Sequence, residues 1–226
     1  MDIKEIVKKL EELKNPKNVL GMARFGIRPK TKVYGILIPE LRKMAKKIGK
    51  NHELALELWK LKIHEARILA GYIAEAKKFT EKQMESWVRD FDSWDVCDQV
   101  CSSVLDKTDF IYKKVFELSK RKEKFVKRTA FTLMACLSVH NKEMKDKDFI
   151  KFFSLIIEAS TDERNFVRKA VNWALRQIGK RNRKLNSEAL KIAKKIQKIE
   201  SKSAKWVATD AIRELESTKV KQRLKN

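Results

Sequence analysis

The chain has 226 residues, of which 43% are hydrophobic and 37% are charged, and this balance excludes a disordered chain. Lys and Arg outnumber Asp and Glu by 53 to 30, which gives a formal net charge of +23. Such a positive field favours a polyanionic partner such as nucleic acid. A lysine-rich solvated surface explains the same charge without any partner, so composition nominates a partner class but no site.

The first segment, MDIKEIVKKLEELKN, alternates charged and aliphatic residues at helical spacing and lacks a continuous apolar core. It therefore matches neither a signal peptide nor a membrane span. The longest mostly apolar run, AFTLMACLSV, is also too short to cross a bilayer. We expect a cytoplasmic protein that makes no contact with a membrane.

Helical spacing of apolar residues continues along nearly the whole chain, which contains only 6 Gly and 3 Pro. No alternating run is long enough to predict a strand, so we predict an all-α fold with helices of about ten to eighteen residues. The expected connections, in chain order, are NPKN, KNHE, KKFTEK, DKTD, NKEMKDKD and RNRKLNSE. None of them is long enough to separate two domains, and we predict a single domain over residues 1–226.

Residues 90 to 98, DFDSWDVCD, place four aspartates in nine positions of a basic chain. Asp92 and Asp95 fall at the expected start of a helix, where carboxylates complement the helix dipole, and we assign them only that structural role. Asp98 falls one turn after Trp94, at the border of the apolar stripe of that helix. A carboxylate beside an aromatic ring at an apolar margin indicates a functional residue, although an Asp paired with an Arg for structure is the alternative.

Three later segments resemble one another. FVKRTAFTLMA begins at Phe125, FVRKAVNWALR at Phe166 and WVATDAIREL at Trp206, at offsets of 41 and 40 residues. Periods near forty are typical of HEAT or armadillo helix pairs, which stack into a superhelical solenoid with a concave face. Chance similarity between amphipathic helices is the alternative, but the shared register favours a repeat.

Cations surround a tryptophan in the helix predicted for ERNFVRKAVNWALRQIGKR. Trp173 lies at the edge of the apolar side, with Lys169 and Arg176 one turn away and Lys180 following. Arg128 occupies the position in the preceding repeat that is equivalent to Lys169. Aromatic and cationic side chains together suit a nucleic-acid backbone, although Trp173 could equally be a core residue of the next repeat.

Three cysteines without a CxxC pair and three widely separated histidines give no ligand spacing for a metal, and we expect no metal and no cofactor. Cys97 and Cys101, four residues apart on one helical face, are better explained as small buried thiols.

WDVCD at 94 to 98, FVKRTA around Arg128 and VRKAVNWALRQIGKR around Trp173 resemble the HEAT-like-repeat DNA alkylation repair glycosylases, the AlkD family. The segment MARFGIRPKTKVYGILIPELRKMAKKIG is similar to the opening helix pair of that family, with its Gly-Ile-x-x-Pro-x-Leu-Arg stretch from Gly35 to Arg42. The likeness covers nearly the whole chain in the same order.

The resemblance implies a monofunctional DNA glycosylase that excises positively charged alkylpurines, such as 3-methyladenine and 7-methylguanine, without flipping the lesion into a pocket. It implies that Trp94, Asp98, Arg128 and Trp173 converge on a concave basic face and carry catalysis. We expect a monomer that acts on double-stranded DNA carrying alkylated bases. The further residues expected to bind DNA are Lys127, Lys169, Arg176, Lys180, Arg181, Arg24 and Phe25.

Two positions depart from the family pattern. Phe25 stands where the family often has Tyr, and Ser93 precedes Trp94 where some members carry a second Trp. Both departures affect the expected range of lesions and the binding of the DNA backbone more than the expected reaction.

The implied reaction explains a single carboxylate in a positive groove. An alkylated purine already carries positive charge and leaves as a neutral base, so it needs no general acid, while Asp98 stabilises the cation that develops on the sugar or orients the attacking water. The tryptophan faces would exclude solvent and favour that cation, while Arg128 and the basic residues from Lys169 to Arg181 would hold phosphates. His64 and His140 fall outside this constellation in sequence.

Two other functions fit the same residues less fully. A non-catalytic basic solenoid that binds DNA, RNA or an acidic protein explains the charge and the repeats, but not a carboxylate beside an aromatic ring in the groove. A DNA-structure binder descended from the enzyme would keep the fold and lose the activity, and the presence of Asp98 argues against it.

Overall fold

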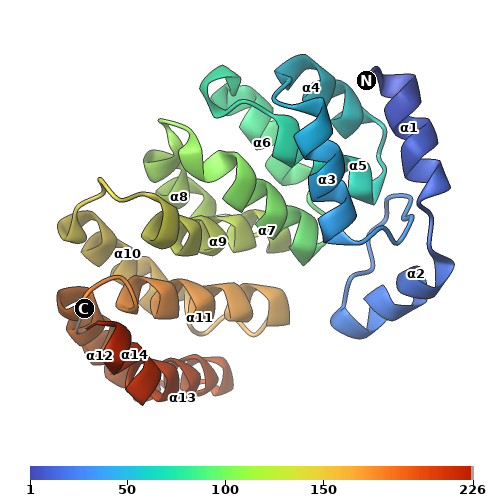
Figure 1. Ribbon diagram of the computed structural model, residues 1–226. Helices are drawn as coiled ribbons and strands as arrows, with labels where there is room; N and C mark the ends of the chain where they lie inside the picture. Colours follow the sequence, from blue (N-terminus) through green and yellow to red (C-terminus); the bar gives the residue numbers. More distant parts are fainter. Residues whose placement is uncertain (225–226) are drawn as a thin grey trace. The chain divides into compact units, whose positions relative to one another are not determined.

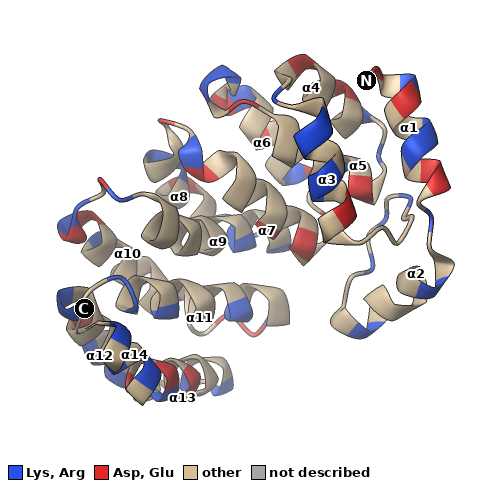
Figure 2. Ribbon diagram, viewed as in Figure 1, with Lys and Arg blue, Asp and Glu red and all other residues tan. Residues whose placement is uncertain are grey.

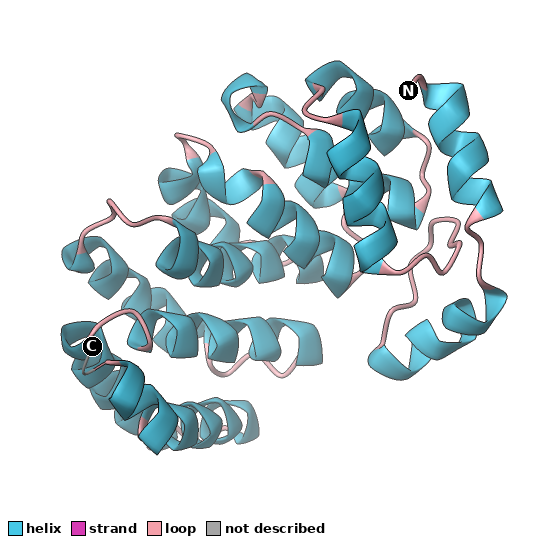
Figure 3. Cartoon of the chain, viewed as in Figure 1, coloured by secondary structure: helices cyan, strands magenta, loops and turns pink. Residues whose placement is uncertain are grey.

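The computed structural model describes residues 1–224, which form two compact units, one from Met1 to Phe110 and one that begins at Ile111 (Figure 1). Within the described residues every regular element is helical, and the connections are short loops (Figure 3). The single β-type contact in this part of the chain is an isolated bridge between Lys32 and Ile63. The all-α prediction is therefore confirmed, whereas the prediction of a single continuous domain stays a prediction.

The first unit is built around one deeply buried helix. Its α-helices are α1 (Ile3–Glu12), α2 (Pro16–Met22), α3 (Ile38–Ile48), α4 (His52–Lys60), α5 (His64–Ile73), α6 (Glu81–Arg89) and α7 (Trp94–Ser103), with short 3-10 helices η1 (Ala23–Phe25), η2 (Ala76–Lys78) and η3 (Leu105–Lys107). Nine of the ten residues of α5 are buried, because α3, α4 and α7 all pack against it. The absence of a side chain at Gly71 lets α7 approach closely, since a Cβ there would lie 3.0 Å from the Val100 side chain.

The second unit consists of two layers of helices. Its α-helices are α8 (Ile111–Ser119), α9 (Lys124–His140), α10 (Asp146–Ala159), α11 (Asn165–Gly179), α12 (Arg183–Gln197), α13 (Lys202–Leu215) and α14 (Thr218–Arg223). Helix α11 packs between α9 and α13 in one layer, and α10 packs between α8 and α12 in the other. The three similar segments of the sequence fall on α9, α11 and α13, as the repeat predicts, with Phe125 and Phe166 each the second residue of its helix.

Five of the six stretches predicted as connections contain the start of an α-helix, and two of them show why. In NPKN the side chain of Asn15 accepts a hydrogen bond from Asn18 N at 3.2 Å, and α2 begins at Pro16. In RNRKLNSE the side chain of Asn182 accepts from Leu185 N at 2.9 Å, so α12 begins at Arg183. Polar composition here reflects helix capping, because an Asn side chain satisfies N–H groups that the helix leaves unpaired.

The core is apolar and includes all three cysteines, which are buried, as expected for Cys97 and Cys101. Among the described residues no helix has the length and apolar character needed to cross a membrane.

Candidate functional site

The four aspartates around Trp94 lie in four different environments. Asp90, at the end of α6, accepts a hydrogen bond from Trp59 Nε1 at 2.9 Å and lies 3.5 Å from an Arg67 nitrogen. Asp92 accepts from Lys30 N at 2.8 Å and from Thr31 N at 3.2 Å, which fixes the loop before α3. The carboxylate therefore caps a distant loop.

Asp95 faces the interior of the first unit. The prediction that Asp95 only supports the helix start is therefore wrong, and the same prediction for Asp92 is wrong because Asp92 binds the loop before α3. The residue is 9% exposed, and its Oδ2 lies 2.8 Å from Nε2 of His64 at the start of α5. Position 95 lies on the face of α7 that packs against α5, so the carboxylate finds its partner there. His64, expected to lie apart from the functional residues, is in direct contact with the helix that carries them.

Burial and charge act in opposite directions on this pair. Burial lowers the pKa of His64, but the hydrogen bond and negative charge of Asp95, with the charge of Glu65, outweigh it and leave the pKa raised. Burial raises the pKa of Asp95, but the hydrogen bond and positive charge of His64 outweigh it and leave that pKa lowered. Both shifts favour an ion pair inside the first unit.

Glu65 fixes the loop that leads into α3. The buried carboxylate accepts hydrogen bonds from the backbone N–H groups of Tyr34 at 3.0 Å, Gly35 at 2.6 Å and Ile36 at 3.3 Å. Gly35 has a positive φ of 74°, and a Cβ there would lie 2.4 Å from the Asn15 carbonyl oxygen, so only glycine fits this turn. Sequence reasoning missed this anchor, whose signal is a pair of ionisable residues at the start of the otherwise mostly apolar segment HEARILAGYI.

Trp94 and Phe25 are joined through the backbone. Trp94 Nε1 donates a hydrogen bond to the Phe25 carbonyl oxygen at 3.0 Å, which holds η1 against the start of α7. The Trp94 side chain is half-buried, whereas Phe25 is 71% exposed and its neighbour Arg24 is also exposed. Asp98 is half-buried one turn after Trp94. The first unit therefore presents a fixed indole, an exposed phenyl ring, a cation and a carboxylate around one helix start.

In the second unit, Arg128 and Lys127 both have partners inside the protein. Arg128 is buried on α9 and donates from Nη1 to the Phe166 carbonyl oxygen of α11. Lys127 pairs with Asp162 at 3.3 Å. Lys127 thereby ties α9 to the connection between α10 and α11, and Arg128 ties α9 to α11. These contacts use part of the hydrogen-bonding capacity of each side chain, so less of that capacity remains for an external ligand.

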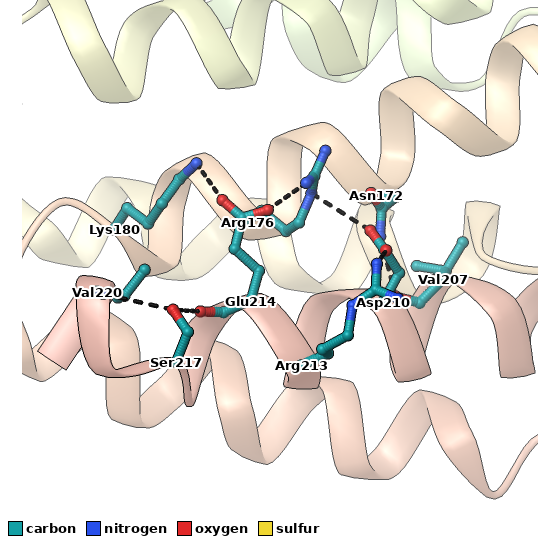
Figure 4. Close-up of polar contacts among 9 residues, drawn as sticks. All are labelled: Asn172, Arg176, Lys180, Val207, Asp210, Arg213, Glu214, Ser217 and Val220. Carbon is teal, nitrogen blue, oxygen red and sulfur yellow. Dashed lines mark hydrogen bonds and ion pairs between the residues drawn. The ribbon is translucent and has the colours of Figure 1, made fainter.

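Helix α11 carries the predicted basic ridge, but acids of α13 neutralise part of it (Figure 4). Arg176 pairs with Glu214 and lies 3.7 Å from Asp210, and Lys180 lies 2.5 Å from Glu214. Burial raises the pKa of Glu214, but the hydrogen bond from Lys180 and the charges of Arg176 and Lys180 outweigh it and leave the pKa lowered. Figure 2 shows acidic and basic residues together on α13.

Trp173 and Lys169 remain accessible on α11. Trp173 is half-buried, in agreement with its predicted place at the edge of the apolar face, and Lys169 is exposed. Of the predicted ridge, Lys169 is thus the cation most available to a ligand.

Arg181 has a structural role in the second unit. It donates to the carbonyl oxygens of Ser138 at 3.0 Å and of Lys142 and Met144 at 3.1 Å, and its guanidinium lies 4.7 Å from the centre of the Phe149 ring. These contacts fix the connection between α9 and α10. Most of its hydrogen-bonding capacity is used inside the protein.

The described residues contain no cluster of three or more His, Cys, Asp or Glu side chains with the geometry to hold a metal ion. The residues predicted for the site supply a carboxylate, aromatic rings and cations.

Comparison with known proteins gives one family match and two similar solved structures. The family model described as DNA alkylation repair enzyme matches residues 6–215. A solved structure described as a new family related to the HEAT-like repeat DNA glycosylases, with affinity for branched DNA structures, has a TM-score of 0.76 and 20% sequence identity, and the match covers 94% of this chain and 95% of that one. A designed armadillo repeat protein in complex with the peptide (KR)4 has a TM-score of 0.42 and 16% identity, over 82% and 78% of the two chains. No curated protein sequence matches the chain.

Proposed function

Because the chain belongs to the DNA alkylation repair enzyme family, we propose that it is a monofunctional DNA N-glycosylase that excises positively charged alkylated purines, of the 3-methyladenine and 7-methylguanine type, from duplex DNA. The observation that carries this proposal is the half-buried Asp98 carboxylate one turn from Trp94, whose indole is fixed by the Phe25 carbonyl oxygen. Arg128 and Lys127, the predicted site residues on α9, are cations and cannot supply this negative charge. A carboxylate beside a fixed aromatic ring suits a cation that forms on an anionic polymer.

The reaction follows from where charge develops. N3- or N7-alkylation leaves positive charge on the purine, so breaking the N-glycosidic bond releases a neutral base and moves the positive charge to the deoxyribose. Asp98 stabilises that sugar cation and orients the water that attacks it. Trp94 presents an aromatic face that excludes solvent and favours a cation through its π electrons, and we assign the same role to Trp173.

Backbone contacts come from cations and one exposed ring. Lys169 and Arg24, both exposed, bind phosphates without regard to sequence, and Phe25 packs against the nucleotide. Arg128, carried over from the family resemblance, is assigned a further phosphate contact. The protein acts as a monomer on double-stranded DNA and needs no cofactor.

The decisive experiment is release of methylated bases from alkylated duplex DNA by the purified protein and by Asp98→Asn. The variant should release bases about two to three orders of magnitude more slowly, because it removes charge stabilisation at nearly constant shape, and its DNA affinity should not change. Asp109→Asn, at an exposed position of the same unit, is the matched control and should keep full activity. Equal rates for the wild type and Asp98→Asn would contradict the catalytic role.

The second candidate is a non-catalytic DNA binder. It is suggested by the solved structure that matches 94% of this chain, which is described as having affinity for branched DNA structures. One measurement on the wild-type protein distinguishes the two candidates. A non-catalytic binder would bind branched and linear duplexes with high affinity but would release no base from alkylated DNA.

A further inference from the structure

An aromatic ring and a cation meet at the surface of the second unit. Trp206, on α13, is 38% exposed, and no other Phe, Trp or Tyr among the described residues of that unit is as exposed. The guanidinium carbon of Arg168, on α11, lies 4.8 Å from the centre of the Trp206 ring. A cation at this distance is attracted to the aromatic face. The proposed reaction assigns no role to either residue, so the pair is available for another function.

Trp206 is the last of three rings that occupy equivalent positions. Phe125, Phe166 and Trp206 lie on α9, α11 and α13 at offsets of 41 and 40 residues. The first two rings contact each other, with centroids 5.8 Å apart, and Phe125 is buried while Phe166 is half-buried. Because Arg168 covers one face of the Trp206 ring, the exposed part of that side chain lies mainly at the opposite face and the ring edge. The last ring of the series therefore has a face available to a partner.

Trp206 shares a helix face with a position equivalent to two predicted DNA-binding residues. At the same offsets of 41 and 40 residues, Arg128 on α9 and Lys169 on α11 correspond to Thr209 on α13. Thr209 follows Trp206 by three residues, and residues three apart lie on the same face of a helix. Arg168 directly precedes Lys169, the exposed lysine assigned to a phosphate. The ring is thus placed beside the surface that is proposed to bind DNA.

The charges around Trp206 favour an anionic partner. Lys202 and Lys205 are exposed at the start of α13, on the N-terminal side of the ring. The N-terminal end of a helix dipole is itself positive, so helix stability does not explain two lysines there. Asp210, one turn after the ring, pairs with Arg213, which balances its charge. The exposed ring is therefore flanked by cations that have no structural purpose at this end of the helix.

We propose that Trp206 and Arg168 form a stacking site for an unpaired base of single-stranded DNA that flanks the duplex. Every base has a π face, so an exposed ring among cations binds unpaired bases with little regard to sequence. Lys202 and Lys205 supply the charge for the phosphates of the same strand. Bases inside a duplex are stacked on their neighbours and do not present their faces, so the site selects a single-stranded segment. It goes beyond the proposed reaction, because no base leaves a duplex and no bond breaks.

Three unmethylated DNAs that share one duplex test the site. The first is blunt, the second has a single-stranded overhang that carries bases, and the third has an overhang of equal length made of abasic nucleotides, which keeps the phosphates and removes the rings. At one salt concentration the wild type should bind the base-bearing overhang at least about fivefold more tightly than the abasic one. The overhang is placed at the 3′ end and, separately, at the 5′ end, and an advantage with either one supports the proposal. Equal affinity for base-bearing and abasic overhangs at both ends would overturn it, because only phosphate contacts would then remain.

Trp206→Phe and Trp206→Leu form a matched pair, because both shorten the side chain and only Phe keeps an aromatic ring. The advantage of the base-bearing overhang should persist in part in Trp206→Phe and should be lost in Trp206→Leu. Affinity for the blunt duplex should stay the same in both variants, which also shows that each variant is folded. Ile150→Ala, at a side chain that is 37% exposed on α10 in the other layer, is the control and should keep the full advantage. Equal results for the Phe and Leu variants would overturn the stacking role.

A 2-aminopurine base in the overhang reports on stacking directly. Its fluorescence should fall when the wild type binds, because the base stacks on the indole, and should fall much less with Trp206→Leu at saturating protein. A change of equal size in the wild type and Trp206→Leu, or no change in either, would overturn the proposal. These measurements use DNA without methylated bases, so their failure is distinguishable from a failure of the proposed base release.

Discussion

At the scale of single residues, the acidic cluster shows how similar side chains acquire different roles. Asp92 fixes a loop, Asp95 forms a buried ion pair and Asp98 remains half-buried on the same helix. Sequence spacing identified Asp98 as unusual, because its position beside Trp94 follows from helix geometry alone. The partner of Asp95 could not be identified in this way, since His64 lies 31 residues earlier and its approach depends on how α5 and α7 pack.

The buried pair makes stability depend on pH in a defined window. The raised pKa of His64 gives a contribution that is complete below its unfolded pKa, about 6.5, and is lost as pH rises through the folded value. The lowered pKa of Asp95 gives a contribution that is complete above its unfolded pKa, about 3.9, and is lost as pH falls through the folded value. The pair therefore contributes most between these two limits.

His64→Gln should lower the free energy of unfolding by about 3 to 5 kcal/mol within that window, because it leaves the Asp95 carboxylate buried without its cation. The loss should shrink as the pH rises above the folded pKa of His64. Urea unfolding of the wild type and the variant at several pH values measures the difference. His140→Gln, at an exposed histidine of the other unit, is the control and should change stability far less than His64→Gln. A wild-type-to-variant difference that is the same at acidic and alkaline pH would contradict an ion pair.

At the scale of helices, the periodicity of apolar residues was sufficient to predict the helices themselves, but not which residues of different helices would pair. The offset between Phe125 and Phe166 predicted equivalent places on α9 and α11, and the structure places both rings at the second residue of those helices, with centroids 5.8 Å apart. The pairing of Arg176 with Glu214, 38 residues later, joins two different helices. Such pairings depend on which faces meet, which a single amphipathic pattern does not specify.

Helix α11 should contribute to DNA binding unequally along its length. Lys169→Ala should weaken duplex binding and reduce the salt dependence by about one unit of slope, because an exposed lysine that neutralises a phosphate releases a counterion. Arg176→Ala should have a smaller effect, since Asp210 and Glu214 already occupy its guanidinium. Fluorescence anisotropy with one duplex at several salt concentrations gives both slopes.

Lys195→Ala is the control for loss of a cation, because Lys195 is exposed on α12 in the other layer of the unit. It should leave the slope close to that of the wild type. If Lys169→Ala and Arg176→Ala reduced duplex affinity and its salt dependence equally, the acids of α13 would have to release Arg176 when DNA binds.

At the scale of the whole molecule, a net charge of +23 should dominate affinity for DNA. We expect binding to an unmodified duplex to weaken by about three orders of magnitude or more between low and physiological salt, as for proteins with many phosphate contacts. Flanking sequence should have little effect, because phosphate contacts carry no sequence information. Affinity that barely changes over this salt range would contradict a basic binding face, and duplexes of different sequence at one salt concentration test the second point.

The leaving group provides a test of the whole reaction. If catalysis depends only on stabilising the sugar cation, excision should be confined to purines that are already cationic, so 7-methylguanine should be released and hypoxanthine retained in otherwise identical duplexes. Release of 7-methylguanine should also persist from about pH 7 to about pH 9, because the mechanism requires no acid that titrates in that range. His64, whose pKa is raised and whose partner Asp95 lies on the helix of Asp98, is the group that would make this expectation fail. Efficient release of hypoxanthine, with a fall in activity as the pH rises through the pKa of His64 and loss of that profile in His64→Gln, would identify this histidine as a general acid and replace the carboxylate-only mechanism.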